Sequence, residues 1–154
     1  MMAMGKKFTK TKASAEATSK STEQPPRPPS PAAKVAEEQR RRDCPVDKDE
    51  LGRSTWNLLH TMAAYYPEKP TETEKETMKT TLDSISKTYP CTHCAEDFRK
   101  DLKTNPPAVS DRDALAKWMC ELHNRVNVKI GKDVFDCGLV KERWLDGWKD
   151  GSCD

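Results

Sequence analysis

Apolar residues recur at helical spacing along most of the chain from residue 44 onwards. In the segment 47–67 the apolar positions are Leu51, Trp56, Leu58, Leu59, Met62 and Tyr66. Their three- and four-residue spacing predicts a first helix with one apolar face. Asp47 and Asp49 suit the positive N-terminal end of such a helix, and Pro67 stops it.

A second helix is predicted over residues 71–88. Thr71 is suited to its N-cap because Glu74 follows three residues later, which is the spacing of a capping box. The apolar residues expected on the inner face of this helix are Met78, Leu82 and Ile85.

Two further helices follow, separated by a proline-containing turn. Pro90 breaks the chain, so the third helix should begin near Cys91 and run to about Lys103. The tripeptide Asn105-Pro106-Pro107 then predicts a turn. The fourth helix should cover 111–130, capped by Asp111 or Ser110 and ended by Gly131. Its apolar positions are Leu115, Trp118, Met119, Leu122, Val126 and Ile130.

The C-terminal segment predicts a short fifth helix around 139–147, with Trp144 on it and Trp148 just beyond. No segment alternates with period two, and VNVKIGKDVF is the only stretch rich in β-formers. We therefore predict an all-α body, a four-helix bundle plus a short fifth helix.

Composition separates a tail from this body. Hydrophobic and charged residues each make up 34% of the 154 residues, which is lean for a fully packed domain. Residues 1–43 carry a net charge of +5 and five of the eleven prolines, whereas residues 44–154 carry a net charge of −3. We expect a disordered, basic, Pro-rich tail at 1–43 and a folded domain at 44–154. The mildly acidic body does not favour nucleic-acid binding, and no stretch is apolar enough for a membrane span.

The six cysteines are the main candidates for chemistry, and all lie in the body, at positions 44, 91, 94, 120, 137 and 153. Cys91 and Cys94 form a C-x-x-C at the predicted start of a helix, where free N–H groups stabilise a thiolate. The pattern favours a redox disulfide. Two alternatives stay open, namely a zinc site and a pair of buried structural thiols.

The zinc alternative uses Cys91, Cys94, Cys120 and His123, whose spacing could supply a tetrahedral ligand set. Cys120 has a second candidate partner in Cys137, and a disulfide between them would contribute about 3 kcal/mol. Cys44 and Cys153 lie at opposite ends of the body. They are either two free surface thiols or a link within one chain or between two chains.

Two helix faces carry polar and aromatic groups that suit a planar cofactor. On the fourth helix Cys120, His123 and Asn127 share a face, with Asn124 beside them and Lys129 and Lys132 near the end. On the first helix Trp56 and His60 are four residues apart, with Arg53 one turn ahead. Polar groups facing a bundle interior are costly unless something satisfies them, so the two faces together suggest a cofactor with polar edges inside the bundle.

With these motifs, the body closely resembles the flavin-linked sulfhydryl oxidases of the augmenter of liver regeneration type. The resemblance runs from residue 44 to 154. It rests on CPVDKDELGRSTWNLLHTMAAYYP, the YPC-x-x-C helix, CELHNRVNVKIGK with its C-x16-C spacing, and ERWLDGWKDGSCD. The combination is specific, although each motif alone is not.

The resemblance implies a helical bundle that holds FAD, forms a homodimer and oxidises dithiols, passing electrons to oxygen or cytochrome c. It implies that Cys91 exchanges with the substrate and Cys94 faces the flavin. It also implies that Cys120 and Cys137 form a structural disulfide and that Cys44 and Cys153 link subunits. The positions expected to line the FAD site are Arg53, Trp56, His60, Tyr65, Cys120, His123, Asn124, Asn127, Lys129, Lys132, Arg143 and Trp144.

One departure from the family concerns residues 1–43, which contain no cysteine. Long mitochondrial members carry a shuttle cysteine pair in a flexible tail that relays electrons from an import oxidoreductase. We therefore expect this chain to oxidise small dithiols well and a folded oxidoreductase partner poorly. The family implies the mitochondrial intermembrane space, and the tail leaves the cytosol open.

Overall fold

The computed structural model describes residues 30–32, 35, 38–39 and 44–153. The chain divides into two units, Met1–Asp43 and Cys44–Asp154. The first unit coincides with the predicted tail, 1–43, and most of it lies outside the described residues. The second unit contains the helical bundle.

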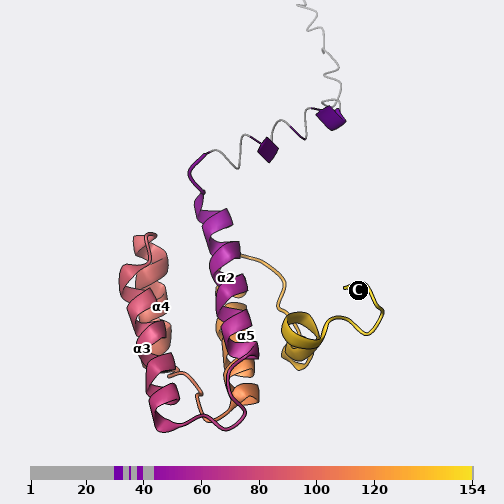
Figure 1. Cartoon of the computed structure of the whole chain (residues 1–154). Helices are drawn as coiled ribbons and strands as arrows, with labels where there is room; N and C mark the ends of the chain where they lie inside the picture. The colour runs from indigo at the N-terminus through magenta and orange to yellow at the C-terminus, as the bar shows by residue number, and fades with distance from the viewer. Residues whose placement is uncertain (1–29, 33–34, 36–37, 40–43, 154) are drawn as a thin grey trace, which may run out of the picture. The chain divides into compact units, whose positions relative to one another are not determined.

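The described part of the body is helical and contains no strand. Figure 1 shows its long helices, α2 (Lys48–Ala64), α3 (Glu72–Thr88), α4 (Thr92–Thr104) and α5 (Arg112–Lys129). Two short elements follow, the 3-10 helix η1 (Cys137–Leu139) and the π-helix η2 (Glu142–Asp146). The predicted all-α class is confirmed, and the predicted fifth helix occurs as these two short elements. No helix of the described residues is long and apolar enough to cross a membrane.

Local capping explains where the helices start and stop. Asp47 accepts hydrogen bonds from the backbone N–H groups of Asp49 and Glu50 at the start of α2. Thr71 and Glu74 form the predicted capping box of α3.

The cap of α5 is Asp111, which accepts from the N–H of Ala114 at 2.8 Å. Ser110 instead donates to the carboxylate of Asp111. At the other end, Gly131 follows the C-cap residue with a φ of 70°, the left-handed conformation that favours glycine there.

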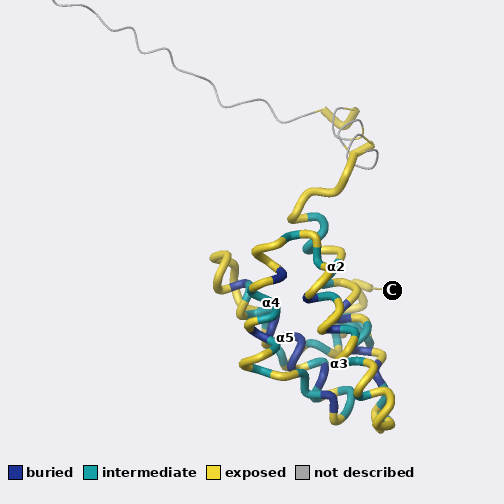
Figure 2. The backbone as a smooth tube through the Cα atoms, turned by 90° about the vertical axis from the view of Figure 1, so that its left-hand side faces the viewer, coloured by how far each residue is buried: buried dark blue, intermediate teal, exposed yellow. Residues whose placement is uncertain are grey.

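The four helices share one core. Figure 1 shows α2 beside α5 and α3 beside α4, and both pairs are in contact. Figure 2 shows that buried positions from these helices gather between them. The buried core residues are Leu59, Ala63, Tyr66, Leu82, Val109, Leu115, Trp118, Met119 and Leu122. Tyr66 and Trp118 satisfy their polar atoms by donating to the carbonyls of Val109 and Asn105.

Two apolar residues expected on inner faces are exposed. Leu58 is 57% exposed whereas Leu59 is 3% exposed. Successive residues of a helix point about 100° apart, so only one of two adjacent leucines can face the core. Ile130 is also 57% exposed, because α5 has already ended at Lys129 and Ile130 is its C-cap.

Candidate functional site

The Cys91–Cys94 pair forms a disulfide at the N-terminus of α4, with Cα atoms 5.3 Å apart. Cys91 is the N-cap residue, and its Sγ accepts a hydrogen bond from the N–H of Cys94 at 3.4 Å. Cys94 is exposed, Cys91 is half-buried, and the next residue, Ala95, is buried and anchors the turn. The free N–H groups of a helix start stabilise a thiolate, so this accessible disulfide is suited to thiol exchange.

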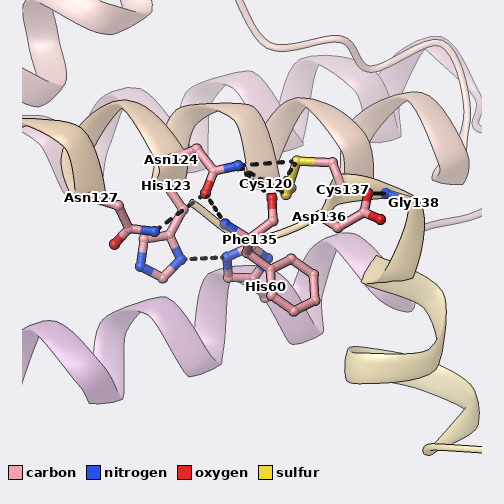
Figure 3. The surroundings of a disulfide bond; sticks show 9 residues. All are labelled: His60, Cys120, His123, Asn124, Asn127, Phe135, Asp136, Cys137 and Gly138. Carbon is pink, nitrogen blue, oxygen red and sulfur yellow. Dashed lines mark hydrogen bonds between the residues drawn. A yellow bond between two sulfur atoms is a disulfide. The ribbon is translucent and has the colours of Figure 1, made fainter. Parts of the chain in front are cut away.

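The second disulfide joins Cys120, on α5, to Cys137, at the start of η1 (Figure 3). Cys120 is 1% exposed. The bond therefore ties the C-terminal segment to the core helix from within.

The zinc alternative is wrong. Three of its four ligands, Cys91, Cys94 and Cys120, are in disulfides and have no thiolate to offer a metal. Within the described part of the chain, no group of three or more His, Cys, Asp or Glu side chains is placed to hold a metal ion.

Four aromatic and imidazole rings from three elements form a cluster. Trp56 and His123 stack with ring centroids 4.0 Å apart and planes 6° apart. His60 and Trp144 stack at 4.5 Å with planes 2° apart. His60 Nε2 and His123 Nδ1 are 2.9 Å apart and join the two stacks through a hydrogen bond. The guanidinium of Arg143 lies 4.3 Å from the centre of the Trp144 ring, which is a cation–π contact.

Both imidazoles of this cluster are neutral at pH 7. The pKa of His60 is lowered to about 3, chiefly by burial and also by the neighbouring His123 and Arg143. Burial also lowers the pKa of His123 to about 4, with a contribution from Lys132. Two neutral imidazoles can share one proton between facing nitrogens, one as donor and the other as acceptor.

Acid should destabilise the protein through this pair. The unfolded chain takes up protons below the ordinary histidine pKa of 6.5, whereas folded His60 does so only near 3. The free energy of unfolding should therefore fall as the pH drops from 6.5 towards 3, by at most about 1.4 kcal/mol per pH unit for His60. Urea unfolding at pH 7 and pH 5 measures this, and His60→Gln should reduce the difference. The control His93→Gln removes an exposed imidazole and should leave the difference intact; equal slopes in all three proteins would contradict the expectation.

A cavity of about 290 Å³ lies beside the ring cluster. His60, Trp144 and Cys137 line it together with three basic side chains, Arg112, Lys117 and Lys141. Asp113 also lines the cavity. The cavity thus combines the stacked His60 and Trp144 rings with a net positive charge, which suits a planar group that carries phosphates.

Other predicted site residues lie elsewhere. Arg53 and Tyr65 are exposed, and among the described residues no hydrogen bond or ring contact joins their side chains to the cluster. Lys129 turns towards α4, where it pairs with Asp101 at 3.1 Å and Asp97 at 3.5 Å. The amide of Asn124 is bonded to the backbone of Phe135.

Sequence reasoning missed three of these partners, Asp97, Asp101 and Phe135. The aspartates are four residues apart on one helix, as Arg125 and Lys129 are on another, and Asp101 is 3.7 Å from Arg125. Two aspartates at i, i+4 on one helix and two basic residues at i, i+4 on another could therefore have indicated these ion pairs between the helices. Phe135 offers only its backbone, so no side-chain pattern could have pointed to it.

The fold and the site define a small helical-bundle protein with one accessible disulfide at a helix N-terminus and a second disulfide whose Cys120 is buried. The sequence model of the Erv1 / Alr family matches residues 53–145. The chain belongs to this family, which confirms the resemblance seen in its motifs.

Known relatives agree with that assignment. The chain is 50% identical over 104 residues to the mitochondrial FAD-linked sulfhydryl oxidase ERV1 of Saccharomyces cerevisiae, covering 68% of this chain and 55% of the relative. It is 45% identical over 100 residues to the FAD-linked sulfhydryl oxidase ERV1 of Arabidopsis thaliana, covering 65% and 52%. The chain thus spans about half the length of these relatives.

Solved structures match the same part of the chain. The crystal structure of the yeast Erv1 core has a TM-score of 0.68 at 50% identity and covers 68% of this chain and 89% of its own. The crystal structure of the FAD binding domain of Erv1 from Saccharomyces cerevisiae has a TM-score of 0.66 at 49% identity, covering 68% and 99%.

Proposed function

We propose that this chain is an FAD-dependent thiol oxidase that forms disulfides in dithiol substrates. The observation that carries the proposal is the accessible Cys91–Cys94 disulfide at the start of α4, in a chain of the Erv1 / Alr family. Relatives named FAD-linked sulfhydryl oxidases support the same activity.

The thiol chemistry needs only the chain's own sulfurs. A substrate thiolate attacks Sγ of Cys91, the Sγ–Sγ bond breaks, and Cys94 leaves as a thiolate. The second substrate thiolate then displaces Cys91, so the substrate leaves as a disulfide and both cysteines are reduced. FAD, when bound, would supply a two-electron acceptor for the reduced pair, with oxygen, reduced to hydrogen peroxide, or cytochrome c as the final acceptor.

This order of attack requires Cys91 to be more accessible to a substrate thiolate than Cys94. Cys94 is the more exposed of the two cysteines in the structure. Bound FAD would make Cys91 the more accessible of the two sulfurs if it shielded Cys94. Alkylation of the reduced protein should therefore modify Cys91 faster than Cys94 when FAD is present.

The residues present fit FAD. The dinucleotide has two planar ring systems and a diphosphate, and the cluster offers stacked rings, neutral imidazoles and nearby cations. Trp56, His60, His123 and Trp144 would hold the rings. Lys132 and Arg143, which lie near the ring cluster but do not line the cavity, would meet the phosphates. We retain Arg53, Tyr65, Cys120, Asn124, Asn127 and Lys129 as proposed neighbours of the cofactor on the strength of the family motif.

An absorption spectrum tests the proposal most directly. The purified protein should be yellow, with flavin bands near about 450 nm that bleach when dithiothreitol is added in air-free buffer. Bleaching requires both the cofactor and a disulfide that passes electrons to it. A colourless protein that takes up no added FAD would overturn the proposed function.

We further propose that the chain forms a homodimer. Leu58, at 57% exposure, leaves apolar surface on α2 for a second copy to cover. Cys44 and Cys153 are exposed free thiols that could link two subunits. Two relatives are named mitochondrial, which supports a mitochondrial location. The intermembrane space is proposed on the family resemblance alone. A dithiol protein or an import oxidoreductase would be the substrate there.

A further inference from the structure

The side chain of Asn124 joins α5 to the segment that follows it (Figure 3). Its Nδ2 donates to the carbonyl of Phe135 at 2.8 Å, and its Oδ1 accepts from the N–H of Phe135 at 2.8 Å. The amide therefore pairs with the backbone of Phe135 as a neighbouring strand would. If the amide were turned over, its Nδ2 would face the N–H of Phe135 and its Oδ1 would face the carbonyl, and neither hydrogen bond could form. These two contacts therefore define the orientation of the amide.

The same amide lies against the buried disulfide. Its Nδ2 is 3.4 Å from Sγ of Cys137 and 3.8 Å from Sγ of Cys120. Asn127, which is 9% exposed, donates to Asn124 Oδ1 at 3.3 Å and holds the side chain from the other side. Phe135 is two residues before Cys137, so the hydrogen bonds to its backbone also restrain that cysteine.

The two disulfides therefore differ in how a thiolate can reach them. Exchange requires a thiolate to approach one sulfur along the S–S axis. Cys94 is exposed at the start of α4, whereas Cys120 is 1% exposed. Attack on the second disulfide has to come at Cys137, which is half-buried and lies on the segment that Asn124 restrains.

We propose that Asn124 is a positioning residue that keeps the Cys120–Cys137 disulfide out of thiol exchange, so that a dithiol reacts only at Cys91–Cys94. This inference rests on the proposed function as a thiol oxidase. Without the restraint, a substrate thiolate would attack Sγ of Cys137 and Cys120 would leave as a thiolate. The second substrate thiolate would then displace Cys137, and two electrons would reduce the structural disulfide while the substrate left as its own disulfide.

The test measures the reduction rate of each disulfide separately. The purified protein is incubated with dithiothreitol in air-free buffer, quenched with an alkylating reagent at intervals, and mapped by peptide mass spectrometry. In Asn124→Ala, the reduction of Cys120–Cys137 should be faster by about tenfold or more, since two hydrogen bonds to the segment are lost. The ratio of the reduction rate at Cys120–Cys137 to that at Cys91–Cys94 should therefore rise.

A second variant covers the case in which Asn124→Ala does not fold. Asn124→Asp has nearly the same shape and can still accept from the N–H of Phe135. It replaces the Nδ2 donor with an oxygen that faces the Phe135 carbonyl and both sulfurs. It should therefore also speed the reduction of Cys120–Cys137.

Two controls separate positioning from general stability. Val109→Ala weakens the core away from this segment, and Asn57→Ala alters an exposed asparagine on α2. If Val109→Ala speeds the reduction of Cys120–Cys137 as much as the Asn124 variants do, or if folded Asn124 variants match the wild type, the inference is overturned. The reduction rates can be measured without bound flavin. A colourless protein would therefore overturn the proposed function but would leave the proposed role of Asn124 to be decided by these rates.

Discussion

Replacing either Cys91 or Cys94 by serine should abolish thiol oxidation, to less than about one thousandth of the wild-type rate. A single thiol cannot close the disulfide that accepts the substrate's electrons. Among the described residues, Cys91–Cys94 is the only disulfide that includes an exposed cysteine. Oxygen consumption with dithiothreitol as substrate measures the loss.

The two variants should differ in what they accumulate. In Cys94→Ser, the free Cys91 thiolate can attack an added small disulfide such as oxidised glutathione, which releases one thiol and leaves a mixed disulfide at Cys91 that peptide mass spectrometry detects. In Cys91→Ser, much less mixed disulfide should form at Cys94 if Cys91 is the sulfur that the substrate attacks. The reverse pattern would exchange the roles proposed for the two cysteines.

Cys44→Ser is the matched control because Cys44 is an exposed free cysteine of the same chain. It should retain full turnover with dithiothreitol. Full activity in Cys91→Ser or Cys94→Ser would mean that the accessible disulfide is not the redox centre.

Removing the buried disulfide should have the largest effect on stability. The double variant Cys120→Ala, Cys137→Ala frees a loop with a sequence separation of 17 residues. Loop-closure entropy predicts a loss of about 3 kcal/mol in the free energy of unfolding. Alanine is chosen because Cys120 is 1% exposed, and a serine there would bury a hydroxyl group.

Urea unfolding measures this loss as a shift of the midpoint. The variant should keep its helical circular dichroism at low denaturant, since the core residues of α2, α3 and α5 do not depend on the bond. Asn57→Ala, which alters an exposed asparagine on α2, serves as control and should leave the midpoint unchanged. An unchanged midpoint in the double variant would show that packing and the Asn124 contacts alone hold the C-terminal segment.

The helices were predictable because their signals are local. Thr71 and Glu74 are three residues apart, and the capping box that they form needs no other part of the chain. Asp111 and Gly131 delimit α5 in the same way, through bonds and backbone angles within a few residues. The C-x-x-C was equally readable, because a separation of three residues at a helix start already brings two sulfurs together.

The spacing of apolar residues was less informative about which side of each helix faces the core. It placed Leu58 and Leu59 on one helix but did not decide which of them faces the core. That choice depends on the direction from which α5 packs against α2, and a pattern on one helix does not contain it.

The sequence by itself therefore determined the helical class, the helix limits, the candidate redox pair and the family motifs. Only the tertiary structure decided that Cys120 bonds to Cys137 and not to a metal, that His60 meets His123 across 63 residues, and that Lys129 pairs with α4. It also assigned the Asn124 amide to the Phe135 backbone. The physical reason is the range of the interactions: caps act within one turn of the chain, whereas these contacts exist only after packing brings distant segments together.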